Sequence, residues 1–226
     1  MSSELPKLVR KFVYDYFAEQ CRAPHMEEIM RKFEISKQEA TIALDSLQRG
    51  RFLYRLQGTQ RILMAWPFSN MATPFLVKTE SGKSYYANCA WDSIGIHVLL
   101  RQPIQIKAYC FHCGDLIELS LSNERVVKKE PADVLVHFSK PAAQWFDDVV
   151  DTCGNNMNFF GSEGHLQEWK AENPEKSGHT LTFNQIVEMS RFFYRDRLKV
   201  DYGRPTPEQI AAFFSSIGLS GDFWRL

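Results

Sequence analysis

The chain has 226 residues, of which 44% are hydrophobic, and its 27 basic side chains balance 27 acidic ones. This length allows one large domain or two small ones. The zero net charge argues against a chain built as a whole to bind nucleic acid or an anionic membrane. No apolar run approaches transmembrane length, and the first residues lack a signal-peptide core. The five cysteines, an odd number, favour free thiols in a reducing compartment, so a cytoplasmic location is expected.

The first part of the chain, residues 1–66, is predicted to form a winged-helix-like module. Periodic apolar residues and turn signals predict three helices and then a hairpin, at roughly 6–20, 24–33, 36–50, 52–56 and 61–66. Ser36 opens the third helix with a capping-box sequence. Proteins with this layout often bind DNA, so a metal-responsive regulator that uses Arg51, Arg55 and Arg61 is one hypothesis. The alternative is a helical module that covers the next domain.

Residues 67–199 are predicted to form a mixed β-sheet domain with flanking helices, and residues 200–226 a helical extension. Residues 67–74 have proline at both ends and are interpreted as a linker. Strands are predicted at 75–79, 104–109, 116–121, 134–138 and after an irregular turn that begins at Cys153. Helices are predicted through 97–100, over 142–150, from Ser162, over 183–199 and over 208–216. The fold class is therefore expected to be α+β.

A short motif in the second part, Cys89-Ala90-Trp91-Asp92, sets a thiol and a carboxyl group three residues apart. On a helical turn these positions share one face. A thiol beside a carboxyl group combines a soft nucleophile with a proton carrier. The plain alternative is a buried structural cysteine and a capping or solvated aspartate. The neighbouring aromatic residues Tyr85, Tyr86 and Trp91 are expected to line a pocket.

A second motif, Cys110-x-x-Cys113, lies in a turn between two predicted strands and could form half of a metal site. The sequence contains no second C-x-x-C pair. Four other residues could complete the site, namely His97, His112, His137 and Cys153. His165 follows Gly164 at the start of a predicted helix and is interpreted as a surface or capping residue.

The order of the motifs is more specific than any one of them. Tyr-Ala-Asn-Cys-Ala-Trp-Asp at 86–92 is followed by Cys-Gly-Asn-Asn-Met-Asn-Phe-Phe-Gly-Ser at 153–162, ahead of Trp169. Over about residues 5–198 this order resembles the alkylmercury (organomercurial) lyase family. The resemblance implies that Cys89 attacks mercury as a thiolate, Cys153 is the second sulfur ligand, and Asp92 carries a thiol proton to the leaving carbon.

The same resemblance implies the other participants in the reaction. The substrate would be a small organomercurial, and the products a hydrocarbon and thiol-bound Hg(II). No resident cofactor is expected, only exogenous thiols that remove Hg(II) or a mercuric reductase that receives it. Cys110 matches a family cysteine regarded as structural. Thiolates suit this chemistry because soft ligands capture soft metals.

One departure from the family pattern concerns the second cysteine. The family places it five residues before the Phe-Phe pair, whereas Cys153 stands six residues before Phe159. On a strand, a shift of one residue turns a side chain to the opposite face. A bulge at Gly154, or a turn that reaches the site from before the strand, would restore the geometry. Otherwise the chain would be a divergent member, such as a non-catalytic soft-metal carrier that binds through Cys89 and Cys153, with Cys110 and Cys113 as further thiols.

Overall fold

The computed structural model describes residues 4–176 and 178–226 and combines helices with two antiparallel sheets. The predicted α+β class is confirmed. Residues 1–3 of the predicted N-terminal module and residue 177 lie outside the described residues. Within the described ranges, no helix is both long and apolar enough to cross a membrane.

Local sequence signals account for several helix starts. Ser36, Thr182 and Thr206 each cap a helix in a reciprocal capping box, which confirms the cap predicted at Ser36. The helices are α1 (Leu5–Gln20), α2 (Met26–Phe33), α3 (Lys37–Arg49), α4 (Ala90–Leu100), α5 (Val149–Asn156), α6 (Glu163–Glu172), α7 (Phe183–Tyr194) and α8 (Pro207–Ser216). Two short 3-10 helices are η1 (Ala142–Gln144) and η2 (Asp222–Trp224).

The larger sheet has eight strands in the order β1-β2-β3-β5-β4-β6-β7-β8, and the smaller has the order β10-β9-β11. The strands are β1 (Tyr54–Arg55), β2 (Ile62–Ala65), β3 (Phe68–Ser69), β4 (Leu76–Thr79), β5 (Ser84–Ala87), β6 (Ile104–Tyr109), β7 (Leu116–Ser122), β8 (Arg125–Glu130), β9 (Leu135–Phe138), β10 (Met157–Phe160) and β11 (His179–Leu181). Buried and exposed residues alternate along β6, as expected for a strand with one face on the core.

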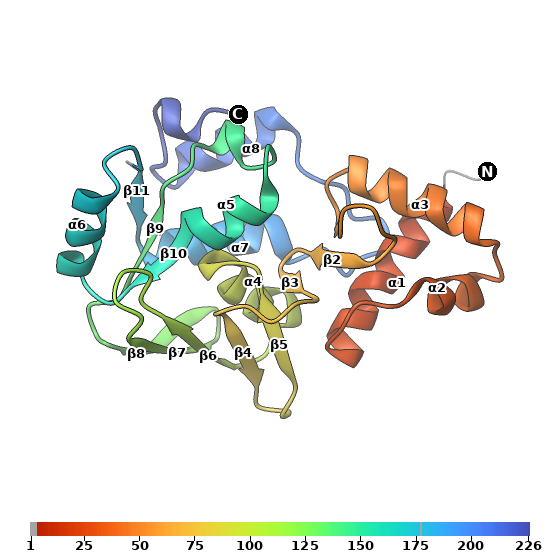
Figure 1. Ribbon diagram of the computed structural model, residues 1–226, viewed down its shortest axis with the longest axis horizontal. Helices are drawn as coiled ribbons and strands as arrows, with labels where there is room; N and C mark the ends of the chain where they lie inside the picture. The colour runs from red at the N-terminus through yellow and green to blue at the C-terminus, as the bar shows by residue number, and fades with distance from the viewer. Residues whose placement is uncertain (1–3, 177) are drawn as a thin grey trace.

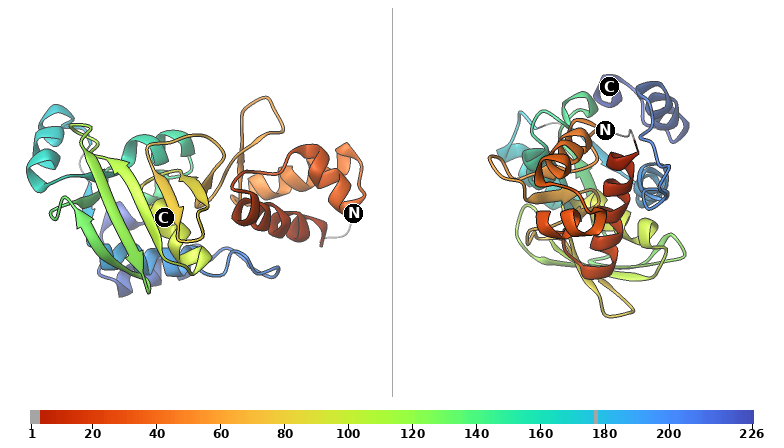
Figure 2. Two further views of the ribbon diagram at one scale, coloured as in Figure 1. Left: turned by 90° about the horizontal axis from the view of Figure 1, so that it is seen from below. Right: turned by 90° about the vertical axis from the view of Figure 1, so that its right-hand side faces the viewer.

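The N-terminal helices α1–α3 stand at one end of the molecule, and α6 lies at the other (Figure 1). The left view of Figure 2 shows the same separation between these helices and the main sheet. The hairpin β1–β2 nevertheless continues into the main sheet, because β2 pairs with β3 and β3 with β5. The winged-helix description and the division at residue 66 stay predictions.

Helix α4 is the centre of the fold. Its residues from Ala90 to Leu99 are all buried, which agrees with the apolar sequence of this helix. It contacts α7 along its length and also contacts strands of both sheets. The helix begins directly after Cys89, so the first motif lies at the N-terminus of the most enclosed helix in the protein.

The structure differs from several local predictions. The helix expected at 142–150 is the short η1, followed by α5 at Val149–Asn156, so Cys153 lies on a helix and not in an irregular turn. The 67–74 linker contains β3, which joins the sheet. Strand β8 was not expected, because its sequence Arg-Val-Val-Lys-Lys-Glu is charged and mostly exposed. Charged residues are common on edge strands, where they discourage pairing with another chain.

The extension that follows residue 199 is part of the core. Phe214 of α8 and Trp224 of η2 are almost fully buried. Their rings pack on each other at 5.2 Å, and Phe214 reaches Trp145 at 6.0 Å between centroids. Aromatic rings at such distances bury large apolar areas and often stabilise a core. The extension therefore covers the region around η1.

Candidate functional site

The candidate site is built first from Cys89, which is the N-cap residue of α4. Its backbone is extended, and its Sγ accepts a hydrogen bond from the backbone N–H of Asp92 at 3.3 Å. An N-terminal helix position exposes free N–H groups and the positive end of the helix dipole. Both favour a thiolate at Cys89.

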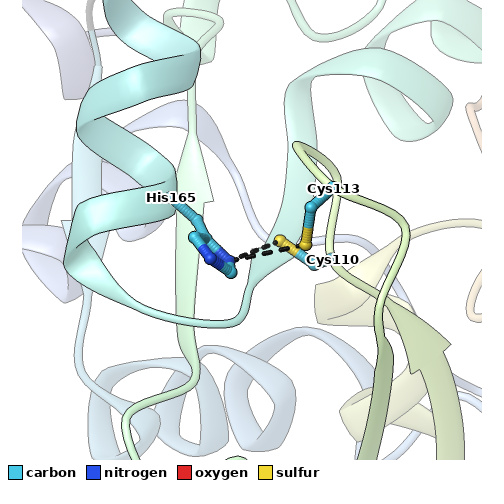
Figure 3. Close-up of side chains that lie close together, drawn as sticks. All are labelled: Cys110, Cys113 and His165. Carbon is cyan, nitrogen blue, oxygen red and sulfur yellow. Dashed lines mark hydrogen bonds between the residues drawn. The ribbon is translucent and has the colours of Figure 1, made fainter.

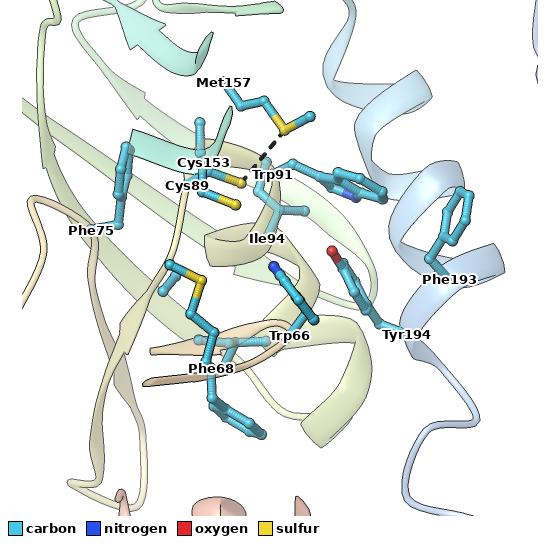
Figure 4. Packing of buried hydrophobic residues seen from close by; sticks show 14 of the residues in the cluster. Trp66, Phe68, Phe75, Cys89, Trp91, Ile94, Cys153, Met157, Phe193 and Tyr194 are labelled. Atoms are coloured by element: carbon cyan, nitrogen blue, oxygen red, sulfur yellow. Dashed lines mark hydrogen bonds between the residues drawn. The ribbon is translucent and has the colours of Figure 1, made fainter. Parts of the chain in front are cut away.

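The second thiol comes from α5. Cys153 is buried on this helix, and the ligand atoms of Cys89, Asp92 and Cys153 all lie within 4.8 Å of one another. Figure 4 shows the two sulfurs side by side, with the Sδ of Met157 4.0 Å from the Sγ of Cys89. The extra residue before Phe159 is accommodated because Cys153 lies on helix α5, which precedes β10. The alternation of side chains between the two faces of a strand therefore does not decide where Cys153 points.

Asp92 lies in the first turn of α4 and is 1% exposed. Its Oδ1 accepts a hydrogen bond of 2.5 Å from the hydroxyl of Tyr194 on α7. Among the described residues nothing bonds its buried Oδ2. Gly95 allows this arrangement, because a Cβ at that position would meet the Tyr194 ring at 2.4 Å.

Burial dominates the electrostatics of the cluster. It raises the pKa of Asp92 to about 6, although the hydrogen bond from Tyr194 acts in the opposite direction. Burial also raises the pKa of the Cys89 thiol well above its usual range, and the nearby Cys153 and Asp92 add to this. The free Cys89 thiol is therefore held in its protonated form. A bound soft cation displaces this proton, since metal ligation requires the thiolate.

A cavity of about 510 Å³ opens onto the cluster. This volume is within the range typical of small-molecule sites. Its wall is mainly apolar and includes residues from the C-terminal extension. The aromatic and aliphatic residues named here share this wall, namely Trp66, Trp91, Trp145, Phe146, Phe193, Ile210 and Leu226. Three guanidinium groups also line it, those of Arg51, Arg197 and Arg204.

The structure separates the predicted residues into two groups. Cys89, Asp92 and Cys153 converge on this cavity, whereas Cys110 and Cys113 form another cluster with His165. The interpretation of His165 as a surface or capping residue is therefore incomplete. None of the three histidines proposed to complete that site belongs to the cluster.

Those three histidines have other partners. Both ring nitrogens of His97 bond the backbone, at Gln102 and Glu124. His112 contacts Glu168, and His137 contacts Thr180.

Several residues of the site were not recognised from the sequence. Tyr194 lies 102 positions from Asp92, and no local pattern connects them. Met157 was part of a quoted segment, but its thioether was not considered as a neighbour of Cys89. Of the three aromatic residues expected in a pocket, only Trp91 lines the cavity. The hydroxyl of Tyr85 donates a hydrogen bond to the carbonyl of Ala18 in α1, and Tyr86 is exposed.

These features define an α+β protein with a buried dithiol and carboxyl cluster able to bind a soft metal. Comparison with known proteins makes the class more specific. Residues 68–195 match the profile of the family described as alkylmercury lyase, which is more than half of the chain. The chain belongs to the alkylmercury lyase family. The matched segment contains both cysteine clusters and Tyr194, but not the N-terminal helices that the sequence resemblance had included.

Individual relatives agree with this assignment. An alkylmercury lyase of Staphylococcus epidermidis is 31% identical over 110 residues, and one of Bacillus cereus is 26% identical over 113. The chain spans about half the length of these curated relatives, 49% and 50% respectively. The crystal structure of the mercury-bound form of MerB2 superposes with a TM-score of 0.66 and 18% identity, and covers 88% of this chain and all of that one. At this identity the superposition shows a shared fold.

Proposed function

We propose that the chain is an organomercurial lyase that cleaves a carbon–mercury bond by protonolysis. The observation that carries the proposal is the convergence of Cys89, Cys153 and Asp92 within 4.8 Å of one another beside an apolar cavity. Two thiols can hold a soft cation, and a buried carboxyl group can deliver a proton. The apolar wall suits the hydrocarbon part of a small organomercurial.

In the first step Cys89 displaces the exogenous thiolate that accompanies the organomercury cation. A sulfur–mercury bond forms to Cys89, and the thiol proton leaves with the displaced thiolate as free thiol. The N–H of Asp92 and the N-terminus of α4 support negative charge on the attacking sulfur.

In the second step Cys153 binds the same mercury atom and transfers its thiol proton to Asp92. Metal ligation lowers the pKa of the thiol, so this transfer becomes favourable once mercury is bound. The pKa of Asp92, raised by burial to about 6, makes it a better proton acceptor than an ordinary carboxylate. The unpaired Oδ2 of Asp92 is the atom available to hold the proton.

In the third step Asp92 gives this proton to the carbon bound to mercury. The electron pair of the carbon–mercury bond becomes the carbon–hydrogen bond, and mercury stays at oxidation state +2. Asp92 returns to the carboxylate, and mercury remains on the two cysteine sulfurs. Exogenous thiols then exchange for the cysteines and carry Hg(II) to a small thiol or to a mercuric reductase.

The experiment that tests this proposal measures hydrocarbon released from methylmercury in excess thiol. Wild type is expected to turn over repeatedly, and Asp92→Asn to bind mercury without release. Cys21→Ser is the control, since Cys21 lies outside the cavity. Stoichiometric binding by wild type without hydrocarbon would favour the soft-metal carrier instead.

The regulator hypothesis predicts salt-dependent DNA binding that is lost when Arg51, Arg55 and Arg61 are mutated. The contacts in the structure give it little support. Arg55 pairs with Asp45 and is mostly buried, and Arg51 covers the ring of Phe146 at 4.3 Å.

A further inference from the structure

A second cluster of potential metal ligands lies away from the cavity. Cys110 directly follows β6 and begins the next turn, Cys113 lies three residues later in that turn, and His165 comes from the first turn of α6 (Figure 3). The Nδ1 of His165 lies 3.5 Å from each sulfur. None of these side chains lines the cavity or takes part in the proposed cleavage.

The two sulfur-to-nitrogen distances match those between ligands of a tetrahedrally coordinated zinc ion. With zinc–sulfur and zinc–nitrogen bonds of about 2.3 Å and about 2.05 Å, a tetrahedral angle separates sulfur from nitrogen by about 3.6 Å. The observed separation of 3.5 Å on both sides therefore needs almost no movement of His165 to accept zinc. The ligand atoms of all three side chains lie within 4.8 Å of one another.

The backbone around the cluster is arranged as a metal-binding turn. Gly114 has a φ of +78°, and its N–H donates to the carbonyl of Cys110 at 2.9 Å, which closes the turn. The N–H of Gly161 donates to the Sγ of Cys110 at 3.3 Å, and a hydrogen bond of this kind orients a thiolate that ligates a metal. A Cβ at Gly161 would lie 3.2 Å from Nδ1 of His165, so this glycine leaves room for the imidazole.

We propose that Cys110, Cys113 and His165 bind one Zn²⁺ ion, with the fourth position open to solvent or an exogenous ligand. The mixed sulfur and imidazole donor set is typical of zinc. The ion would join the turn after β6 to the first turn of α6. This site does not depend on the proposed lyase activity.

The test measures zinc bound to the untagged full chain after gel filtration, by mass spectrometry of the metal. Wild type is expected to carry one Zn²⁺ per chain. Cys113→Ser and His165→Gln should weaken zinc binding by more than the ~10–100-fold loss that outer-shell changes cause. His112→Gln is the matched control, because His112 lies in the same turn and its ring packs beside that of His165 at 5.9 Å between centroids, while its Nε2 pairs with Glu168 and not with a thiol.

Cys153→Ser removes a thiol of the cavity cluster and leaves Cys110, Cys113 and His165 unchanged. This variant should therefore retain zinc. Replacement by Co²⁺ should give tetrahedral d–d absorption and sulfur-to-cobalt charge transfer in wild type, a readout that does not require any variant to fold. A zinc-free wild type, zinc retained by both ligand variants, or zinc lost from Cys153→Ser would overturn the proposal. Binding of Hg(II) but not Zn²⁺ at these side chains would overturn it as well.

Discussion

Replacing Asp92 by Asn should stabilise the protein at alkaline pH while it abolishes cleavage. Asp92 is buried, and burial raises its pKa from 3.8 to about 6. The folded state therefore binds this proton more tightly than the unfolded state does. The resulting stability is fully present below about pH 3.8 and is lost as the pH rises through about 6.

The size of the effect follows from these two pKa values. Each pKa unit corresponds to about 1.4 kcal/mol, so the ionised carboxylate costs about 3 kcal/mol of folding free energy at about pH 8. Asn is neutral and similar in shape, and its carbonyl can still accept the hydroxyl of Tyr194. Asp92→Asn should therefore gain most of this free energy relative to wild type.

Urea unfolding of wild type and Asp92→Asn at about pH 4 and about pH 8 measures the difference. All other titrating groups are shared, so the change in that difference with pH reports on Asp92. The variant should gain about 2–3 kcal/mol relative to wild type between the two pH values. A difference in unfolding free energy that does not change with pH would refute the conclusion that Asp92 is a buried carboxyl group with a raised pKa.

Three further substitutions test the surroundings of the site. Tyr194→Phe removes a hydrogen bond to the Asp92 carboxylate and should move the pH profile of hydrocarbon release upward by about 1; Tyr85→Phe, which loses a bond to α1 instead, should leave the profile unchanged. Gly95→Ala would place a Cβ 2.4 Å from the Tyr194 ring and should cost about 1–3 kcal/mol in urea unfolding, and no loss would contradict the close packing. Phe214→Ala should cost about 3–5 kcal/mol, whereas an unchanged unfolding midpoint would show that the extension is not part of the core.

The sequence predicts those features that depend on local patterns. Helical periodicity and capping residues located α3, α7 and α8, and the alternation in β6 located that strand. The spacing of Cys89 and Asp92 on one helical turn was also a local signal, and α4 places both at its N-terminus. The fold class follows from such patterns, because each element must bury its apolar face against another.

The sequence could not predict contacts between distant segments. Tyr194 meets Asp92 only because α7 packs along α4. The need for glycine at position 95 likewise follows only from the position of the Tyr194 ring, which leaves no room for a Cβ. His165 offered one weak signal, its position three residues after the cap Ser162 in a helix. Its two sulfur neighbours lie more than fifty residues away, so helix periodicity could not identify them.

The most direct test of the account follows methylmercury and excess thiol in heavy water, with mass spectrometry of the gas above the solution. Because protonolysis places one exchangeable proton on the departing carbon, wild type should release singly deuterated methane over many turnovers. Asp92→Asn should release almost none, although Cys89 and Cys153 still hold the metal. Mercury binding without methane from wild type, or equal methane from both proteins, would contradict the claim that these side chains cleave the carbon–mercury bond.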